Sequence, residues 1–153
     1  MANVSSFTVA NAFLDLAEKS GAKLTNMQVQ KLVFLAQGYS LALLNRPLFY
    51  HNIHAWQFGP VIPKLYKKLQ QYGNGYVSDK VSTELMESGA LDTEDKKVID
   101  AVYSAYGSWT GSKLSALTHL DNTPWDITFR KEPFSIIPQD LIQEYYSEQI
   151  QVA

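Results

Sequence analysis

The sequence contains no cysteine, which excludes disulfide bonds and thiolate metal sites. It also has no excess of basic residues, because 13 lysines and arginines are set against 15 aspartates and glutamates, for a formal net charge of −2. This balance gives no global field that would gather nucleic acid phosphates. No apolar run approaches the ~18 residues of a membrane span, and the N-terminus lacks the features of a signal peptide. We therefore expect a cytoplasmic protein with no membrane partner.

Helical periodicity dominates what is present. The chain has 153 residues, 46% of them hydrophobic, which suits one domain spanning 1–153. Helix start signals stand at Ser5 or Ser6, Thr25, Pro63, Asp92, Thr110 or Ser112, Thr123 and Pro138. We predict a mainly α fold, a compact single-domain bundle of about six helices. The helix after Thr25 is apolar around most of its circumference, so we expect it at the centre, and its interior Gly38 indicates a close neighbour.

The β content is expected to be small. Residues 48–58 lose the helical period and gain aromatic and β-branched side chains, which favours a short strand. Residues 76–81 are a second candidate strand that could pair with it, and 77–91 show no clear pattern. In the stretch HAWQFGPVIPKLY, Pro60 and Pro63 each keep the preceding residue extended, and Gly59 gives the turn room. We interpret this junction as an architectural turn from strand to helix, with Pro63 in the first helical turn.

Histidine chemistry is weakly supported. His51 and His54 form an H-x-x-H pair, but residues three apart on a strand face opposite sides, and no carboxylate lies nearby. We expect no metal and no cofactor. His119 lies at a helix end, where a structural role is favoured over proton transfer. An enzyme using His119 with Asp121 or Ser115 is a minor alternative, because no nucleophile elbow is present.

The functional interpretation that we favour for the aromatic residues is a protein-binding surface. Aromatic residues make up 12% of the chain, and Trp and Tyr are common at interface hot spots. Tyr145 and Tyr146 cannot both face one core, so one of them should lie at a boundary. The predicted partner contacts are Trp56, Lys64, Tyr66, Lys67, Tyr145 and Tyr146. Nucleic acid binding through Lys64, Lys67 and Lys68 ranks last, given the net charge.

The order of several motifs resembles one known family. The segments are LTNMQVQKLVFLAQGYSLA, RPLFYHNIHAWQFGPVIPKLY, LDTEDKKVIDAVYSAYGSWTGSKLSALTH, TPWD and IIPQDLI, which together run from Leu24 nearly to the C-terminus. They are similar to the Panacea-domain proteins, also called the SocA-like antitoxin family, some of which are phage-associated. The matching motif residues that we interpret as structural include Gln30, Lys31, Gln37, Gly59, Pro60, Pro63, His119, Pro124 and Trp125.

The resemblance implies a non-enzymatic function. Family members look like antitoxins of bacterial and prophage toxin–antitoxin systems, which bind and neutralise a cognate toxin encoded nearby. One branch acts instead as an adaptor that delivers its toxin to a AAA+ protease. We therefore expect direct toxin binding, with protease delivery as the alternative.

Overall fold

A computed structural model describes residues 2–84, 87 and 89–152. Within these residues the chain forms seven α-helices, a 3₁₀-helix and two short strands, which confirms the predicted mainly helical fold. The α-helices are α1 (Ser6–Lys19), α2 (Asn26–Leu44), α3 (Pro63–Leu69), α4 (Thr93–Tyr106), α5 (Gly111–Thr118), α6 (Pro124–Lys131) and α7 (Gln139–Val152). The strands are β1 (His54–Trp56) and β2 (Gly59–Val61), and the 3₁₀-helix η1 (Gln70–Tyr72) follows α3. Of the helices in this part of the chain, none has both the length and the apolar character needed to cross a bilayer.

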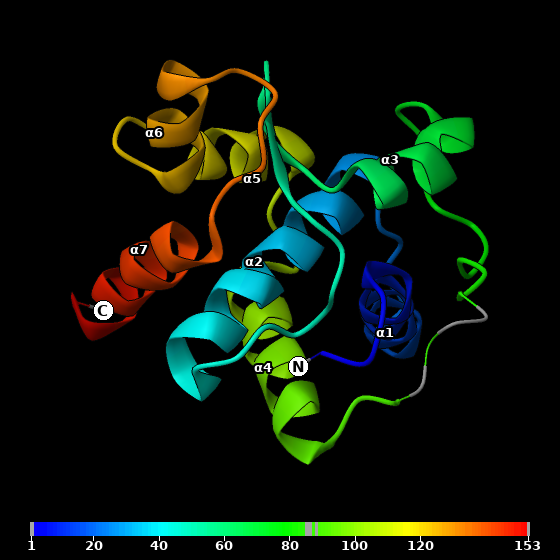
Figure 1. Ribbon diagram of the computed structural model, residues 1–153. Helices are drawn as coiled ribbons and strands as arrows, with labels where there is room; N and C mark the ends of the chain where they lie inside the picture. Colours follow the sequence, from blue (N-terminus) through cyan, green and yellow to red (C-terminus); the bar gives the residue numbers. More distant parts are fainter. Residues whose placement is uncertain (1, 85–86, 88, 153) are drawn as a thin grey trace.

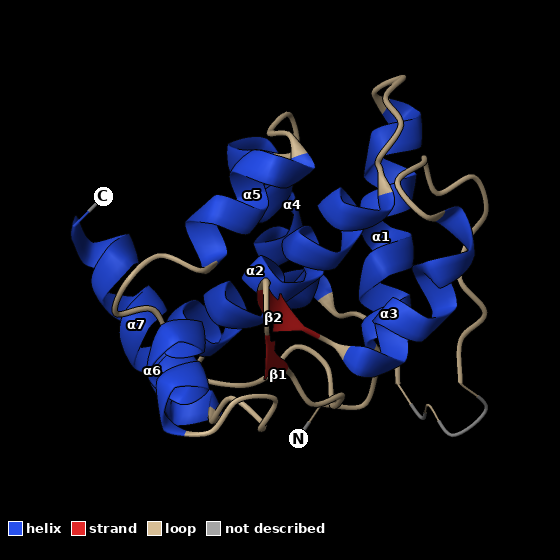
Figure 2. Cartoon of the chain, turned by 90° about the horizontal axis from the view of Figure 1, so that it is seen from above, coloured by secondary structure: helices blue, strands red, loops and turns tan. Residues whose placement is uncertain are grey.

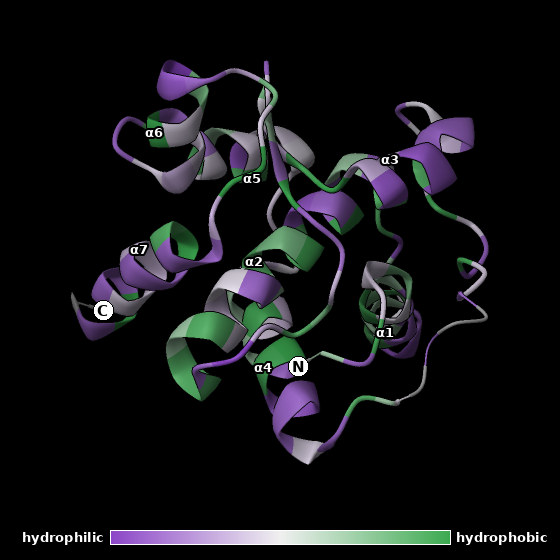
Figure 3. Ribbon diagram, viewed as in Figure 1, coloured by the Kyte–Doolittle hydropathy of each residue, from purple (hydrophilic) through white to green (hydrophobic). Residues whose placement is uncertain are grey.

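Helix α2 is the centre of the molecule, as its apolar circumference predicts. It crosses the middle of the fold in Figure 1 and packs against α1, α4, α5 and α7. Its buried side chains occur on every face, from Val29 to Leu41. Figure 3 shows hydrophobic residues along α2, whereas α3 is mostly hydrophilic. The other helices therefore bury their apolar faces against a shared central helix.

Side-chain caps begin the helices at the expected places. Thr25 accepts a hydrogen bond from the N–H of Gln28, whose side chain bonds back to Thr25, which forms a capping box. Asp92 and Asp95 form the same arrangement at α4. Ser5, Thr110 and Thr123 cap α1, α5 and α6. These caps satisfy N–H groups that have no partner inside the helix, and so they set where each helix starts.

The close neighbour expected at Gly38 is α7. A Cβ placed on Gly38 would lie 2.5 Å from Cδ2 of Tyr146, which is closer than real Cβ atoms approach. The aromatic ring of Tyr146 therefore fills the space that a side chain at Gly38 would need. Tyr146 is buried, and Tyr145 lies half-buried beside it, which confirms that one of the two lies at a boundary.

The β element is a hairpin rather than one long strand. Strand β1 pairs antiparallel with β2, with His54 opposite Val61 and Trp56 opposite Gly59. Figure 2 shows the two strands between α6 and α3. The predicted strand at 48–58 is thus wrong for 48–53, and β2 continues where a turn was expected. The candidate strand at 76–81 is also wrong, since Tyr76 forms an isolated bridge with Thr25.

The side chain of Gln37 bonds to the backbone of residues 48 and 49, at the start of the predicted strand. Its Oε1 accepts hydrogen bonds from the N–H groups of Leu48 and Phe49, at 2.7 and 3.2 Å. Its Nε2 donates to the carbonyl oxygen of Phe49 at 3.0 Å. The N–H of Tyr50 then donates to the carbonyl of Val4. Gln37 on α2 therefore provides residues 48 and 49 with the hydrogen bonds that a neighbouring strand would otherwise make.

The segment between η1 and α4 is held by two carboxylates. The sequence shows no clear pattern at 77–91, and within this range 85, 86 and 88 lie outside the described residues. Glu87 accepts hydrogen bonds from the N–H and Oγ of Ser5 and from Oγ1 of Thr8, which fastens the segment to the start of α1. Burial opposes ionisation of Glu87, but the hydrogen bonds that it accepts lower its pKa on balance. Glu84 accepts from Tyr50, a bond that lowers the pKa of Glu84, and contacts His51.

Candidate functional site

The junction between β2 and α3 has the geometry expected of its prolines and glycine. Ile62 is extended, with φ −98° and ψ 100°, and Pro63 opens α3. Gly59 has φ +129°, a conformation that L side chains rarely adopt. Pro60 presents its carbonyl oxygen toward α2. The junction is therefore a rigid turn that places β2 against the central helix.

Lys31 makes the contact from α2. Its Nζ donates a hydrogen bond to the carbonyl oxygen of Pro60 at 2.9 Å. The side chain is only 5% exposed, and burial lowers the pKa of its amine to about 8. A Cβ at Gly59 would make a tight contact of 3.3 Å with Nζ of Lys31 and an ordinary contact of 3.7 Å with Nδ1 of His119, so the positive φ is the main reason for glycine at this position.

Replacing Gly59 with alanine should destabilise the protein by about 2 kcal/mol, from backbone strain and from crowding of the Lys31 amine. Urea unfolding measures this change. The matched control is Gly21→Ala, because Gly21 also has a positive φ of 74° but open space around it. We expect the control to cost about 1 kcal/mol. A Gly59→Ala variant no less stable than the control would show that the contact with Lys31 is not tight.

A pocket of about 760 Å³ opens beside this junction. Its volume falls within the range of roughly 300–1,000 Å³ that is typical of binding sites. Its wall is built by the start of α2, the hairpin with the adjoining α3, the start of α5 and Phe134, which bring together separate parts of the sequence. Lys31 lines it, and no aspartate or glutamate does so among the residues that the structure describes.

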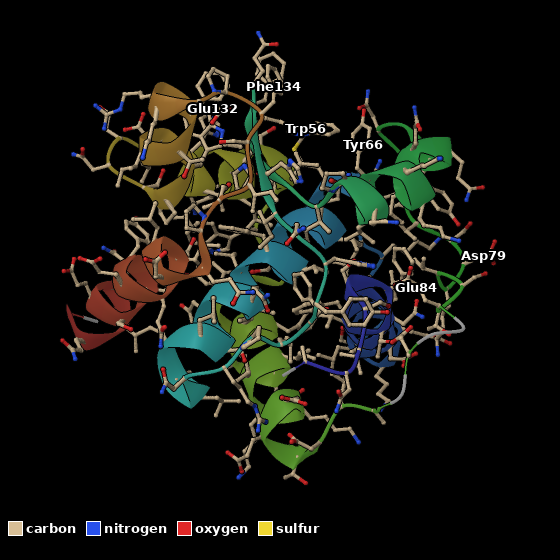
Figure 4. All side chains as sticks on the ribbon, viewed as in Figure 1. Trp56, Tyr66, Asp79, Glu84, Glu132 and Phe134 are labelled. Atoms are coloured by element: carbon tan, nitrogen blue, oxygen red, sulfur yellow. The ribbon has the colours of Figure 1, made fainter. Side chains whose placement is uncertain are left out.

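Large apolar side chains surround the pocket. We call them the apolar rim: Met27, Trp56, Phe58, Tyr66 and Phe134. Phe58 is 75% exposed at the hairpin turn, and Phe134 is 57% exposed. Figure 4 shows Trp56, Tyr66 and Phe134 at the same end of the molecule. Clustered exposed apolar groups of this kind are typical of sites that bind other molecules.

The predicted partner-binding residues do not form one group in the structure. The rings of Trp56 and Tyr66 meet edge to face, with centroids 5.2 Å apart, on the apolar rim. Lys64 and Lys67 are exposed on α3. Tyr145 and Tyr146 lie on α7 and do not line the pocket. Tyr146 is buried against α2 and is not part of the exposed surface.

The motif residues interpreted as structural lie around the junction and the core. Gln30 donates to Oδ1 of Asn26 and lines the pocket. Pro124 is buried at the start of α6. Nε1 of Trp125 donates to the carbonyl oxygen of Trp56 at 2.6 Å, which fastens β1 to α6. The ring of His119 packs edge to face on Trp125, with centroids 5.4 Å apart.

The residues of the minor enzyme alternative do not form a catalytic arrangement. Oγ of Ser115 donates to the carbonyl oxygen of Phe58 at 3.4 Å. Nδ1 of His119 is buried without a hydrogen-bond partner in the described part of the chain. No hydrogen bond between Ser115, His119 and Asp121 occurs there, so they do not pair a nucleophile with an adjacent base.

The two other histidines are also apart. His51 is buried, and its ring nitrogens contact Oγ of Ser6 and Oε1 of Glu84, each at 2.8 Å. Nδ1 of His54 contacts the carbonyl oxygen of Phe134 at 3.1 Å. Between residues 2 and 152, leaving out 85, 86 and 88, no three His, Asp or Glu side chains are grouped as a metal site would need.

Sequence reasoning missed three residues of the apolar rim, Met27, Phe58 and Phe134. A partial signal was available for Phe58, because an apolar residue just before Gly59-Pro60 is unusual in a turn. Phe134 has φ +67°, and a bulky residue in this conformation is uncommon. Lys31 also carried a signal, as a lone charge among the apolar residues of the central helix.

Comparisons with known proteins agree with the resemblance in the sequence. The profile of the family described as "Antitoxin SocA-like, Panacea domain" matches residues 29–126. Antitoxin SocA of Caulobacter vibrioides (strain NA1000 / CB15N) is 30% identical over 132 residues, which cover 82% of this chain and 70% of that protein. No solved structure gives a significant match. The chain belongs to the SocA-like, Panacea-domain family of antitoxins.

Proposed function

We propose that this protein neutralises a toxin by binding it directly, and that the apolar rim is the centre of the contact. Family membership supports an antitoxin role. The proposed location of the contact is supported by the grouping of exposed Phe58, Tyr66 and Phe134 around one pocket. Aromatic side chains lose little conformational entropy on binding and commonly dominate interface energies. Lys64 and Lys67, exposed on the adjoining α3, would lie at the edge of this contact.

The test uses the product of each gene next to the one that encodes this chain. We expect one of them to arrest growth when expressed alone, to be neutralised by co-expression, and to co-elute with the purified protein. Phe58→Ser should weaken binding at least about tenfold, which is about 1.4 kcal/mol. Leu43→Ser is the matched control, because Leu43 is 51% exposed at the end of α2 and does not line the pocket. Calorimetric titration measures both affinities.

Two results would count against the proposal. If no neighbouring product binds or is neutralised, the antitoxin function by direct binding is wrong for this chain. If Leu43→Ser weakens binding as much as Phe58→Ser does, the contact lies elsewhere. The toxin level, followed by immunoblot, should stay constant during neutralisation. A fall that requires a AAA+ protease would indicate delivery for degradation.

A further inference from the structure

Lys31 is a buried positive charge that has no counter-charge among the residues that the structure describes. Its amine contacts one neutral acceptor, the carbonyl oxygen of Pro60. No ion pair within the described part of the chain includes Lys31, although five other pairs of a lysine or arginine with a carboxylate are formed there. The pocket that it lines contains no carboxylate in that same part of the chain. An ammonium group removed from water is costly unless an anion compensates it.

The surroundings of Lys31 favour a small anion with apolar neighbours. Helices α2 and α5 both begin at the pocket, with Thr25 and Thr110 in its wall, so their positive ends lie there. The apolar rim adds large apolar side chains to the wall, beside neutral polar residues such as Gln30 and Asn74. A polyanion such as nucleic acid would need several cations in reach, whereas Lys31 is the one lysine or arginine that lines the pocket in the described residues.

We propose that Lys31 binds a carboxylate side chain of the toxin, an aspartate or glutamate flanked by apolar residues that the apolar rim covers. This inference rests on the proposed function, and it assigns the chemical nature of the group that enters the pocket. The ammonium of Lys31 supplies the charge, and its hydrogen bond to Pro60 holds it in place. Since the amine would remain largely protonated at pH 7 with a pKa of about 8, it can pair with the incoming carboxylate.

The first experiment measures the affinity of Lys31→Met for the toxin found by the co-expression test. We expect a loss of at least about 100-fold, because the toxin carboxylate would be left buried without a partner. Lys97→Met removes an exposed lysine of α4, which does not line the pocket, and should change the affinity less than about threefold. The thermal unfolding temperature of Lys31→Met should not fall by more than a few degrees, so that lost binding is not lost folding.

Substitutions in the toxin identify the carboxylate. One Asp→Asn or Glu→Gln change should reproduce the loss and should add little when combined with Lys31→Met. If Lys31→Met binds as tightly as the parent protein, the inference is wrong while the antitoxin function stands. If the parent protein itself binds no toxin, the proposed function fails. If a C-terminal extension of the toxin, and no side-chain change, reproduces the loss, the partner is the chain terminus and the assignment to a side chain is wrong.

A second experiment needs no toxin. The probes are 3-phenylpropionate and 3-phenylpropanamide, which share an aromatic ring and differ in charge. Chemical-shift changes in nuclear magnetic resonance spectra of the pocket residues report binding, with affinities expected in the millimolar range for ligands of this size. The acid should bind at least about tenfold more tightly than the amide, and Lys31→Met should remove the difference. Equal binding of the two probes, no binding of either, or an unchanged preference in Lys31→Met would each overturn the inference.

Discussion

Replacing Gln37 with leucine is expected to destabilise the protein by about 3–5 kcal/mol, because three buried backbone groups lose their partners at once. The N–H groups of Leu48 and Phe49 and the carbonyl of Phe49 all bond to this one side chain. Gln37 is 1% exposed, so water cannot replace it without a rearrangement. Urea unfolding at neutral pH measures the change.

The control for this prediction is a glutamine that also contacts backbone, but at the surface. Gln143 on α7 donates to the carbonyl oxygen of Leu41 and to Oδ1 of Asn45. It is half-buried, and water can take its place, so Gln143→Leu should cost less than about 1 kcal/mol. A similar cost for the two variants would mean that Gln37 does not substitute for a strand as described above.

Replacing Gly38 with alanine is expected to destabilise the protein by about 3 kcal/mol, although alanine is the better helix former. The new methyl group would overlap the ring of Tyr146, which is itself held in the core between α2 and α7. The interior of a protein is too tightly packed to absorb such an overlap without moving a helix. Thermal and urea unfolding both report the loss.

A second substitution should reverse the sign of this effect. In a Tyr146→Ala background the space beside Gly38 is empty, so Gly38→Ala should stabilise that variant by up to about 1 kcal/mol. The double-mutant cycle therefore predicts a coupling of about 3–4 kcal/mol between the two positions. Additive effects would contradict the assignment of Tyr146 as the neighbour that excludes a side chain from position 38.

The helices could be predicted because their signals are local. Thr25 with Gln28, Asp92 with Asp95, and Thr123 before Pro124 are each complete within four residues, and each begins a helix in the structure. The same holds for Pro63 at the start of α3. A cap needs no distant partner, so the pattern alone is sufficient.

The β element could not be predicted in this way. Residues 48–50 have side chains typical of a strand, but their backbone groups bond to Gln37 and Val4. Strand β2 contains Pro60, which cannot donate a hydrogen bond and argues against a strand in the sequence. It forms because β1 lies beside it, and β1 is in turn held by residues 134–137. These partners are distant in the sequence, and no local pattern reveals them.

The candidate functional site could be predicted from the sequence only in part. The sequence predicts both Trp56 and Tyr66 as partner contacts, and the structure places their rings in contact. The pocket itself depends on α2, the hairpin, α3 and α5 meeting at one place. The burial of Lys31 follows from that meeting and from Gly59, which leaves room for its amine. Lys31, which the sequence shows only as an isolated lysine on a helix, is thus a buried charge in the wall of the pocket.

The attachment of α1 to Glu87 has a consequence for protein synthesis. Ser5 is made well before Glu87, and its N–H donates to that carboxylate, 82 positions later in the chain. The carbonyl oxygen of Val4 likewise accepts a hydrogen bond from the N–H of Tyr50, which is made later. While the chain is growing, the start of α1 therefore lacks its contacts with Glu87 until residue 87 has left the ribosome. We expect chains that stop before this point to leave the start of α1 accessible to proteases, even when α2 is complete.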